Sequence, residues 1–235
     1  MASRTTEAQT PGRTGLAALS DPHSAMPSAR PVLCLVVDRA AARGSLDRVV
    51  ASACAAGVDW VQLRERELEG KAWLDWAETL AEAARRGAPA VRIVVNRRLD
   101  MALAIGADGI HLGFDAVDPT EARALLAKHT LVGVSTHDPA EVEAIQAGAV
   151  DYVHLAPIYD PRSKPANRPA LGLEALTRAS RHGLPVLAQG GIDPERGRAA
   201  IAAGAVGVAV TGEILLADEP AAAAAALRAA LDGTG

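Results

Sequence analysis

Short apolar runs alternate with helix-forming segments along the chain from residue 31 to its end. The apolar runs have the length and the Val, Ile and Leu content of strands buried on both faces; they occupy residues 32–37, 59–64, 91–96, 109–112, 131–135, 152–155, 185–188 and 206–210. Helical spacing or helix-capping residues mark the segments between them; these are the residues after Ser45, then 73–86, 100–105, 119–128, 139–146, 173–181, 193–204 and 219–231. The pattern predicts about eight strands alternating with about eight helices.

One phrase recurs before several of these strands, as AAGVDWVQL, AIGADGIHL, QAGAVDYVHL and AAGAVGVAV. In each copy a glycine ends a helix and the chain turns into a buried strand, which is the αβ turn of a repeating unit. About eight such units in one chain predict an α/β fold, a single (β/α)₈ TIM barrel. A flavodoxin-like open sheet is the alternative, although it usually needs only five or six strands.

Residues 1–30 differ from the rest of the chain, because they are rich in Ser, Thr, Pro, Ala and Arg and contain no aromatic residue. We predict a disordered N-terminal extension there and one barrel domain over residues 31–235. A net charge of −4 gives no electrostatic case for nucleic acid. No apolar run approaches the roughly 20 residues of a membrane span. We therefore expect a cytoplasmic protein with a small-molecule ligand, and with neither a nucleic-acid nor a membrane partner.

Two glycine turns end the last two predicted strands. Gly190 and Gly191 follow residues 185–188, and Thr211 and Gly212 follow residues 206–210. Backbone N–H groups in such turns bind phosphate without Lys or Arg, and the loops after strands 7 and 8 are the usual phosphate site of a TIM barrel. The spacing predicts phosphate binding by Gly190, Gly191, Val210 and Thr211. The alternative is that these glycines only permit tight turns.

Polar and cationic residues stand at the ends of five other predicted strands, where barrel chemistry is located. They are Gln62, Arg64, Glu65 and Arg66; Asn96, Arg97 and Arg98; His111, Gly113 and Asp115; Ser135 and His137; and Tyr159, Arg162, Ser163 and Lys164. A cationic rim opposite a phosphate cup indicates an anionic substrate that carries a second polar ring or phosphate. Solvated loop charges are the alternative.

The motifs VQLRER, VVNRRLDMAL, ADGIHLG, VGVSTHD, DYVHLAPIYDPRSK and AQGGI with GVAVTGEI resemble the thiamin phosphate synthase / thiazole tautomerase family, in the same order. The resemblance implies a (β/α)₈ barrel, a role in thiamin biosynthesis and a phosphorylated thiazole as ligand. Synthases of this family join a pyrimidine diphosphate to a thiazole phosphate, release pyrophosphate and need Mg²⁺. Tautomerases move protons to aromatise a 2-carboxy-thiazole phosphate and need no metal.

Three positions favour the tautomerase. The synthase pattern places Asp after Asn96 and Asp at the end of the motif after strand 4, but this chain has Arg97 and Ala116 there. At about 4 Å from a divalent ion, an Arg in place of Asp adds several kcal/mol of repulsion. Arg66 completes the Arg-Glu-Arg sequence typical of tautomerases. We therefore expect a metal-independent tautomerase without a cofactor; Asp115 would ligate Mg²⁺ only in a synthase.

The resemblance also implies a role for each matching residue. His137 is the expected proton shuttle, because a proton transfer at neutral pH suits an imidazole. The expected substrate-binding residues are Gln62, Arg64, Arg66, Asn96, Ser135 and Lys164, and most of these also match diphosphate-binding positions of the synthase. A Mg²⁺-dependent synthase and a non-catalytic thiazole-phosphate-binding regulatory protein are the alternative functions. The assembly is left open, a homodimer included.

Overall fold

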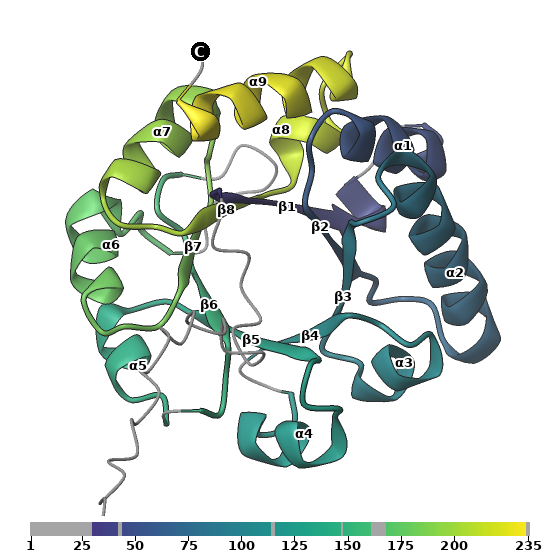
Figure 1. Cartoon of the computed structure of the whole chain (residues 1–235), viewed down its shortest axis with the longest axis horizontal. Helices are drawn as coiled ribbons and strands as arrows, with labels where there is room; N and C mark the ends of the chain where they lie inside the picture. The colour runs from purple at the N-terminus through teal and green to yellow at the C-terminus, as the bar shows by residue number, and fades with distance from the viewer. Residues whose placement is uncertain (1–29, 42–43, 114–115, 147, 161–167, 234–235) are drawn as a thin grey trace, which may run out of the picture.

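Eight parallel strands close into a barrel in the order of the sequence (Figure 1). The computed structural model describes residues 30–41, 44–113, 116–146, 148–160 and 168–233. The strands are β1 (Val32–Asp38), β2 (Trp60–Arg64), β3 (Arg92–Asn96), β4 (Gly109–Leu112), β5 (Leu131–Thr136), β6 (Tyr152–Leu155), β7 (Val186–Gln189) and β8 (Gly207–Val210). Because β1 pairs with β8 as well as with β2, the predicted TIM barrel is confirmed and the open sheet is wrong.

Helices form an outer ring around the barrel (Figure 1). They are η1 (Arg39–Ala41), α1 (Leu46–Ala55), α2 (Gly70–Gly87), α3 (Leu99–Ala104), α4 (Pro119–Leu125), α5 (Pro139–Glu143), α6 (Gly172–Ser180), α7 (Pro194–Ala202), α8 (Gly212–Leu215) and α9 (Pro220–Asp232). α4 and α5 end three residues before their predicted ends at 128 and 146. In the described part of the chain, no helix combines the length and the apolar character that crossing a membrane requires. The predicted extension lies outside the described residues, apart from Arg30.

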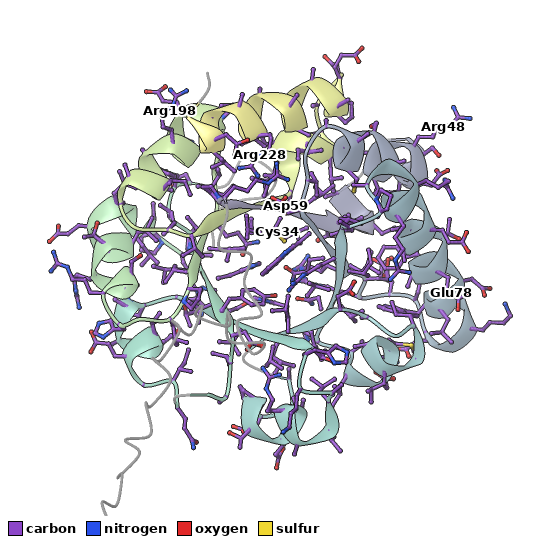
Figure 2. All side chains as sticks on the ribbon, in the orientation of Figure 1. Cys34, Arg48, Asp59, Glu78, Arg198 and Arg228 are labelled. Carbon is purple, nitrogen blue, oxygen red and sulfur yellow. The ribbon has the colours of Figure 1, made fainter. Side chains whose placement is uncertain are left out.

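Two apolar clusters form the core. The larger cluster lies between the barrel and the helices, and the smaller one fills the inside of the barrel. Figure 2 shows Cys34 inside the ring of strands, whereas Arg48, Glu78 and Arg198 point outward from the helices. Trp60 and Tyr152, the first residues of β2 and β6, pack edge to face with ring centroids 5.0 Å apart.

Gly133 in β5 makes room for this aromatic pair. A Cβ atom at that position would lie 2.1 Å from Cζ of Tyr152, so only glycine lets the tyrosine ring cross the barrel there. The two large rings therefore fill the amino-terminal end of the barrel. The opposite end, where the strands finish, stays open for a ligand.

Three aspartates fix the entry into alternate strands. Asp59, Asp108 and Asp151 each precede an even-numbered strand, and each carboxylate accepts a hydrogen bond from the backbone N–H of a residue in the preceding strand. The donors are Leu33, Ile93 and Val132, at 2.7–2.8 Å. In return, the backbone N–H of each aspartate donates to the carbonyl of its donor residue. These reciprocal pairs, called the aspartate clamps below, explain why three copies of the recurring phrase carry an Asp just before the strand.

Candidate active site

A cavity of about 590 Å³ opens at the carboxyl ends of the strands, a size typical of small-molecule sites. Five strands contribute their last residue to its lining; these are Asp38, Arg64, Asn96, Gln189 and Val210. The cavity also brings together most of the predicted site residues, namely Gln62, Arg66, Ser135, His137, Gly190, Gly191 and Thr211. Lys164 and Asp115 lie outside the described residues.

Buried polar side chains form the floor of the cavity. Gln62 donates from Nε2 to Oδ1 of Asn96 at 3.1 Å. Nε2 of His111 lies 2.9 Å from Oγ of Ser135, and its Nδ1 lies 3.2 Å from the hydroxyl of Tyr152. These bonds fix the orientation of the polar groups that a ligand would meet.

Two buried atoms of the floor have no hydrogen-bond partner among the described residues. They are Oε1 of Gln62 and Nε2 of His154, and both side chains line the cavity. Because an unpaired buried polar atom is destabilising, such atoms in a cavity indicate where a ligand or water binds. Gln62 offers an acceptor, so it selects a ligand that carries a donor.

Burial keeps the two floor histidines neutral. It lowers the pKa of His154 to about 3, although a hydrogen bond with Gln189 acts in the opposite direction. Burial also lowers the pKa of His111 well below its usual value, and the neighbouring His154 lowers it further. The histidines of the floor therefore contribute hydrogen bonds but no positive charge.

That charge comes from four arginines in the described lining, which are Arg64, Arg66, Arg97 and Arg168. The same lining contains two carboxylates, Asp38 and Glu213. Asp38 forms an ion pair with Arg64. The cavity therefore has an excess of positive charge and suits an anion.

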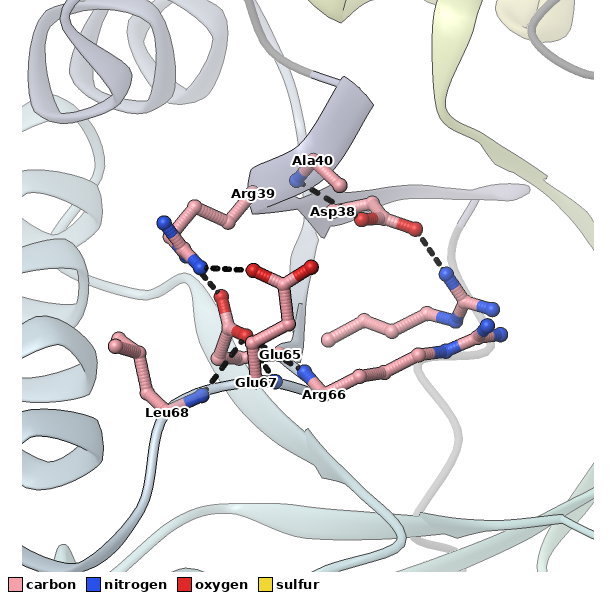
Figure 3. Close-up of polar contacts among 8 residues, drawn as sticks. Asp38, Arg39, Ala40, Glu65, Arg66, Glu67 and Leu68 are labelled. Carbon is pink, nitrogen blue, oxygen red and sulfur yellow. Dashed lines mark hydrogen bonds and ion pairs between the residues drawn. The ribbon is translucent and has the colours of Figure 1, made fainter.

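Glu65 shapes the loop that carries one of these arginines, Arg66. Its Oε1 accepts hydrogen bonds from the backbone N–H groups of Arg66, Glu67 and Leu68, and its Oε2 binds Arg39 (Figure 3). Burial raises the pKa of Glu65, but the backbone donors and Arg39 outweigh it and leave the pKa lowered. Its side chain is 3 % exposed and does not line the cavity. Glu65 therefore holds the loop and does not meet the ligand.

Gly190 and Gly191, which are predicted to bind phosphate, line the cavity together with Val210 and Thr211; these four residues are called the cup below. Both glycines have positive φ, at 97° and 62°. A Cβ on Gly190 would lie 2.8 Å from Cβ of Pro157. The glycines are thus needed for close packing against the loop after β6. Their backbone N–H groups have no acceptor among the described residues, and this leaves them available to an anion.

Arg196 holds the back of this cup. Its Nη1 donates to the carbonyl of Gly191 at 2.8 Å, and its guanidinium lies 4.8 Å from the ring centre of Tyr159. Asp193 caps α7, as predicted, by accepting from the backbone N–H of Arg196 at 2.9 Å. The cup is therefore fixed by side chains that themselves lie outside the cavity lining.

His137 lines the cavity beyond β5. Its Nδ1 lies 2.7 Å from the carbonyl oxygen of Ala156. Because a carbonyl oxygen can only accept, Nδ1 carries the proton, and in the neutral ring Nε2 is the acceptor. The carboxylate of Glu141 accepts from the backbone N–H of His137 at 2.7 Å and fixes the start of the following turn.

Sequence reasoning missed several lining residues, among them Asp38, Gln189 and Arg168. Asp38 stood at the end of the first predicted strand, and this position was a sufficient signal. Gln189 ends β7 beside the predicted glycines. Arg168 comes from the long loop after β6, where no periodic pattern indicates which side chain reaches the cavity.

The described residues do not fit the Mg²⁺ site that the synthase pattern implies. They contain no group of three or more His, Cys, Asp or Glu side chains placed to hold a metal ion. Arg97 occupies one expected ligand position and lines the cavity. Ala116 occupies another and lines a neighbouring hollow beside α4, which shares Gly113 and Ser135 with the cavity. A guanidinium about 4 Å from a divalent cation is repelled by several kcal/mol at intermediate dielectric.

Comparison with known proteins identifies relatives of the chain. The family model described as thiamine monophosphate synthase matches residues 33–214. The chain is 39 % identical to a thiamine-phosphate synthase of Mycolicibacterium smegmatis, with 88 % of this chain and 94 % of the relative covered. It is 37 % identical to a thiamine-phosphate synthase of Azorhizobium caulinodans, with 85 % and 94 % covered.

A solved structure shares the fold. The thiamine phosphate pyrophosphorylase from Pyrococcus furiosus superposes with a TM-score of 0.75 at 22 % identity, with 86 % of this chain and 96 % of that chain covered. At this identity the likeness concerns the barrel alone.

The expected thiazole tautomerase is wrong, because the relatives that match most of the chain are named thiamine-phosphate synthases. The expectation rested on Arg-Glu-Arg and on missing carboxylates. The structure shows that Glu65 of that motif is a loop-holding residue outside the cavity lining. The motif therefore says little about the reaction.

Proposed function

Because the chain belongs to the thiamine monophosphate synthase family, we propose that it is a transferase of thiamine biosynthesis. It joins a pyrimidine diphosphate to a thiazole phosphate and releases pyrophosphate. The observation that carries the proposal is that Gly190, Gly191 and four arginines line one cavity, because backbone N–H groups and guanidinium groups both bind phosphate oxygens. Relatives 37–42 % identical over most of the chain support the same activity.

In this proposal the thiazole phosphate binds in the cup. The N–H groups of Gly190 and Gly191 and the turn at Val210 and Thr211 surround its oxygens. The pyrimidine ring lies over the floor, where Oε1 of Gln62 accepts from a ring substituent. The diphosphate lies along the rim, held by Arg64 and Arg66.

The reaction is a displacement at the carbon that carries the diphosphate. The carbon–oxygen bond breaks, and its electron pair leaves with pyrophosphate. The thiazole nitrogen uses its lone pair to form the new carbon–nitrogen bond. No proton has to leave either substrate, so the protein positions the two rings and stabilises charge on the leaving group.

Each rim residue then has a defined task. Arg64 is held by Asp38 and presents its remaining donors to the diphosphate. Ser135, which His111 orients, contacts the leaving group in this proposal. Removing one preorganised donor to developing charge lowers the rate by about 10² to 10³. None of these steps uses a metal ion.

The test supplies thiazole phosphate and pyrimidine diphosphate to the full chain and measures thiamin phosphate and pyrophosphate. We expect both products in equal amounts. Arg64→Ala is expected to lower turnover by about 10² or more, while Arg48→Ala, on the outer face of α1 (Figure 2), leaves it unchanged. Absence of thiamin phosphate under all ionic conditions would exclude the activity.

A further inference from the structure

We infer that a guanidinium cluster of Arg66, Arg97 and Arg168 replaces the divalent cation in holding the diphosphate, so that anion binding in this cavity is independent of Mg²⁺. The inference rests on the proposed function for the identity of the anion. It deepens that function by naming what neutralises the leaving group.

The first support is the position of Arg97. It follows Asn96 directly, at the end of β3, and its side chain lines the cavity. Its backbone N–H donates to the carbonyl of His111 at 2.8 Å, which ties the turn to the neighbouring strand β4. The side chain therefore starts from a fixed point at the cavity wall, where a cation ligand would otherwise stand.

The second support is the charge of the lining. Its described carboxylates are Asp38, already paired with Arg64, and Glu213 on α8. Magnesium binds through one or two carboxylates with near-octahedral geometry. The lining instead offers planar guanidinium groups, which bind phosphate oxygens in pairs and carry their charge at every physiological pH.

The third support is the geometry of the rim. Arg66 extends away from the side of the loop on which Glu65 and Arg39 meet (Figure 3). No described residue forms an ion pair with Arg66. Arg168 enters the lining from the loop after β6. The loops after β2, β3 and β6 thus each bring one cation to the same cavity.

The experiment measures binding of inorganic pyrophosphate to the full chain by calorimetry, once with EDTA and once with Mg²⁺. We expect the two affinities to agree within about threefold. Arg97→Asn is expected to lower affinity by about 10- to 100-fold in EDTA, the loss of one or two charge-assisted hydrogen bonds. Arg97→Lys, which keeps the charge, is expected to recover part of that loss. Arg48→Ala is the control for charge on the outer surface.

A double variant tests directly whether the arginines replace the divalent cation. Arg97→Asp combined with Ala116→Asp rebuilds the acidic pair of the synthase pattern, and this variant is expected to bind pyrophosphate only with Mg²⁺. Asp115→Asn is expected to leave metal-free binding unchanged. Loss of wild-type binding in EDTA, restored by Mg²⁺, would overturn the inference. Metal-free binding without thiamin phosphate formation would instead overturn only the proposed function, so the two failures are distinguishable.

Discussion

Arg97 has a strained backbone conformation, and its side chain lines the cavity. Among the described non-glycine residues it is the one with positive φ, at 67°. The left-handed region is several-fold more favourable for Asn than for most residues, whereas Arg gains nothing there. Strain of this kind is often concentrated at functional sites. The guanidinium is therefore kept at some cost in stability.

We predict that Arg97→Asn raises the free energy of unfolding by about 0.5 to 1 kcal/mol, because Asn fits the left-handed turn. The same variant is expected to bind pyrophosphate more weakly. Urea unfolding measures the first effect and calorimetry the second. A variant that loses both stability and affinity would show that Arg97 is a structural residue.

His137 should matter little to the rate, because the proposed displacement moves no proton. His137→Asn keeps a donor that can reach the carbonyl of Ala156, and it is expected to change turnover by less than about tenfold. Loss of a general acid or base typically lowers the rate by about 10² or more. Steady-state rates across neutral pH distinguish the two cases. A hundredfold loss with a new pH dependence would restore a proton-transfer role.

At the scale of elements, the aspartate clamps repeat at β2, β4 and β6 and are absent at β8. At β8, Val206 occupies the position of the aspartate. The backbone N–H of Val206 donates to the carbonyl of Val186, just as the backbone N–H of Asp59 donates to the carbonyl of Leu33. Val206 is 38 % exposed, so a carboxylate there stays solvated. A fourth clamp is therefore absent at β8 because Val206 has no carboxylate.

We predict that Val206→Asp stabilises the chain by about 0.5 to 1.5 kcal/mol, through a hydrogen bond from the N–H of Val186. Asp151→Ala is expected to cost roughly 1 to 3 kcal/mol, because it leaves the N–H of Val132 unpaired. Thermal and urea unfolding measure both. A destabilised Val206→Asp would mean that the clamp geometry does not extend to β8.

The sequence predicts the barrel and its cup because both depend on local signals. Glycines after helices mark four of the turns into strands, and Gly190 with Gly191 marks the cup that is predicted to bind phosphate. The clamps could not be foreseen, since Asp59 binds Leu33, 26 residues earlier in the chain. The role of Glu65 was hidden for the same reason, because its partner Arg39 is also 26 residues away. The Arg-Glu-Arg motif, interpreted without that contact, and the missing carboxylates at positions 97 and 116 together led to the wrong reaction.

At the scale of the whole molecule, the aromatic layer and the histidine floor lie against each other inside the barrel. His111 and His154 are 1 % exposed, with ring centres 4.1 Å apart. The tyrosine ring of Tyr152 lies against both histidines, at 5.6 and 5.5 Å. Burial disfavours the charged form of each imidazole, and at this separation two charged rings would repel each other, so the folded chain favours the neutral forms.

This requirement makes stability depend on pH with a definite sign. The pKa of His154 is lowered to about 3 in the folded chain, against roughly 6.5 when unfolded. Below about pH 6.5 the unfolded state therefore takes up a proton that the folded state refuses, and stability falls as pH falls. For one such histidine the loss between pH 7 and pH 5 is about 2 kcal/mol.

We predict that His154→Gln flattens this dependence by roughly that amount, even if it lowers stability at pH 7. Urea midpoints of the wild type and the variant at the two pH values measure the difference. The quantity compared is the change in unfolding free energy between the two pH values. A packing defect lowers this free energy equally at both pH values, and the titrating carboxylates are the same in both proteins, so only the titration of residue 154 changes the difference. Parallel pH profiles would mean that His154 already carries a proton in the folded barrel, and the charge of the cavity floor would then add to that of the arginine rim.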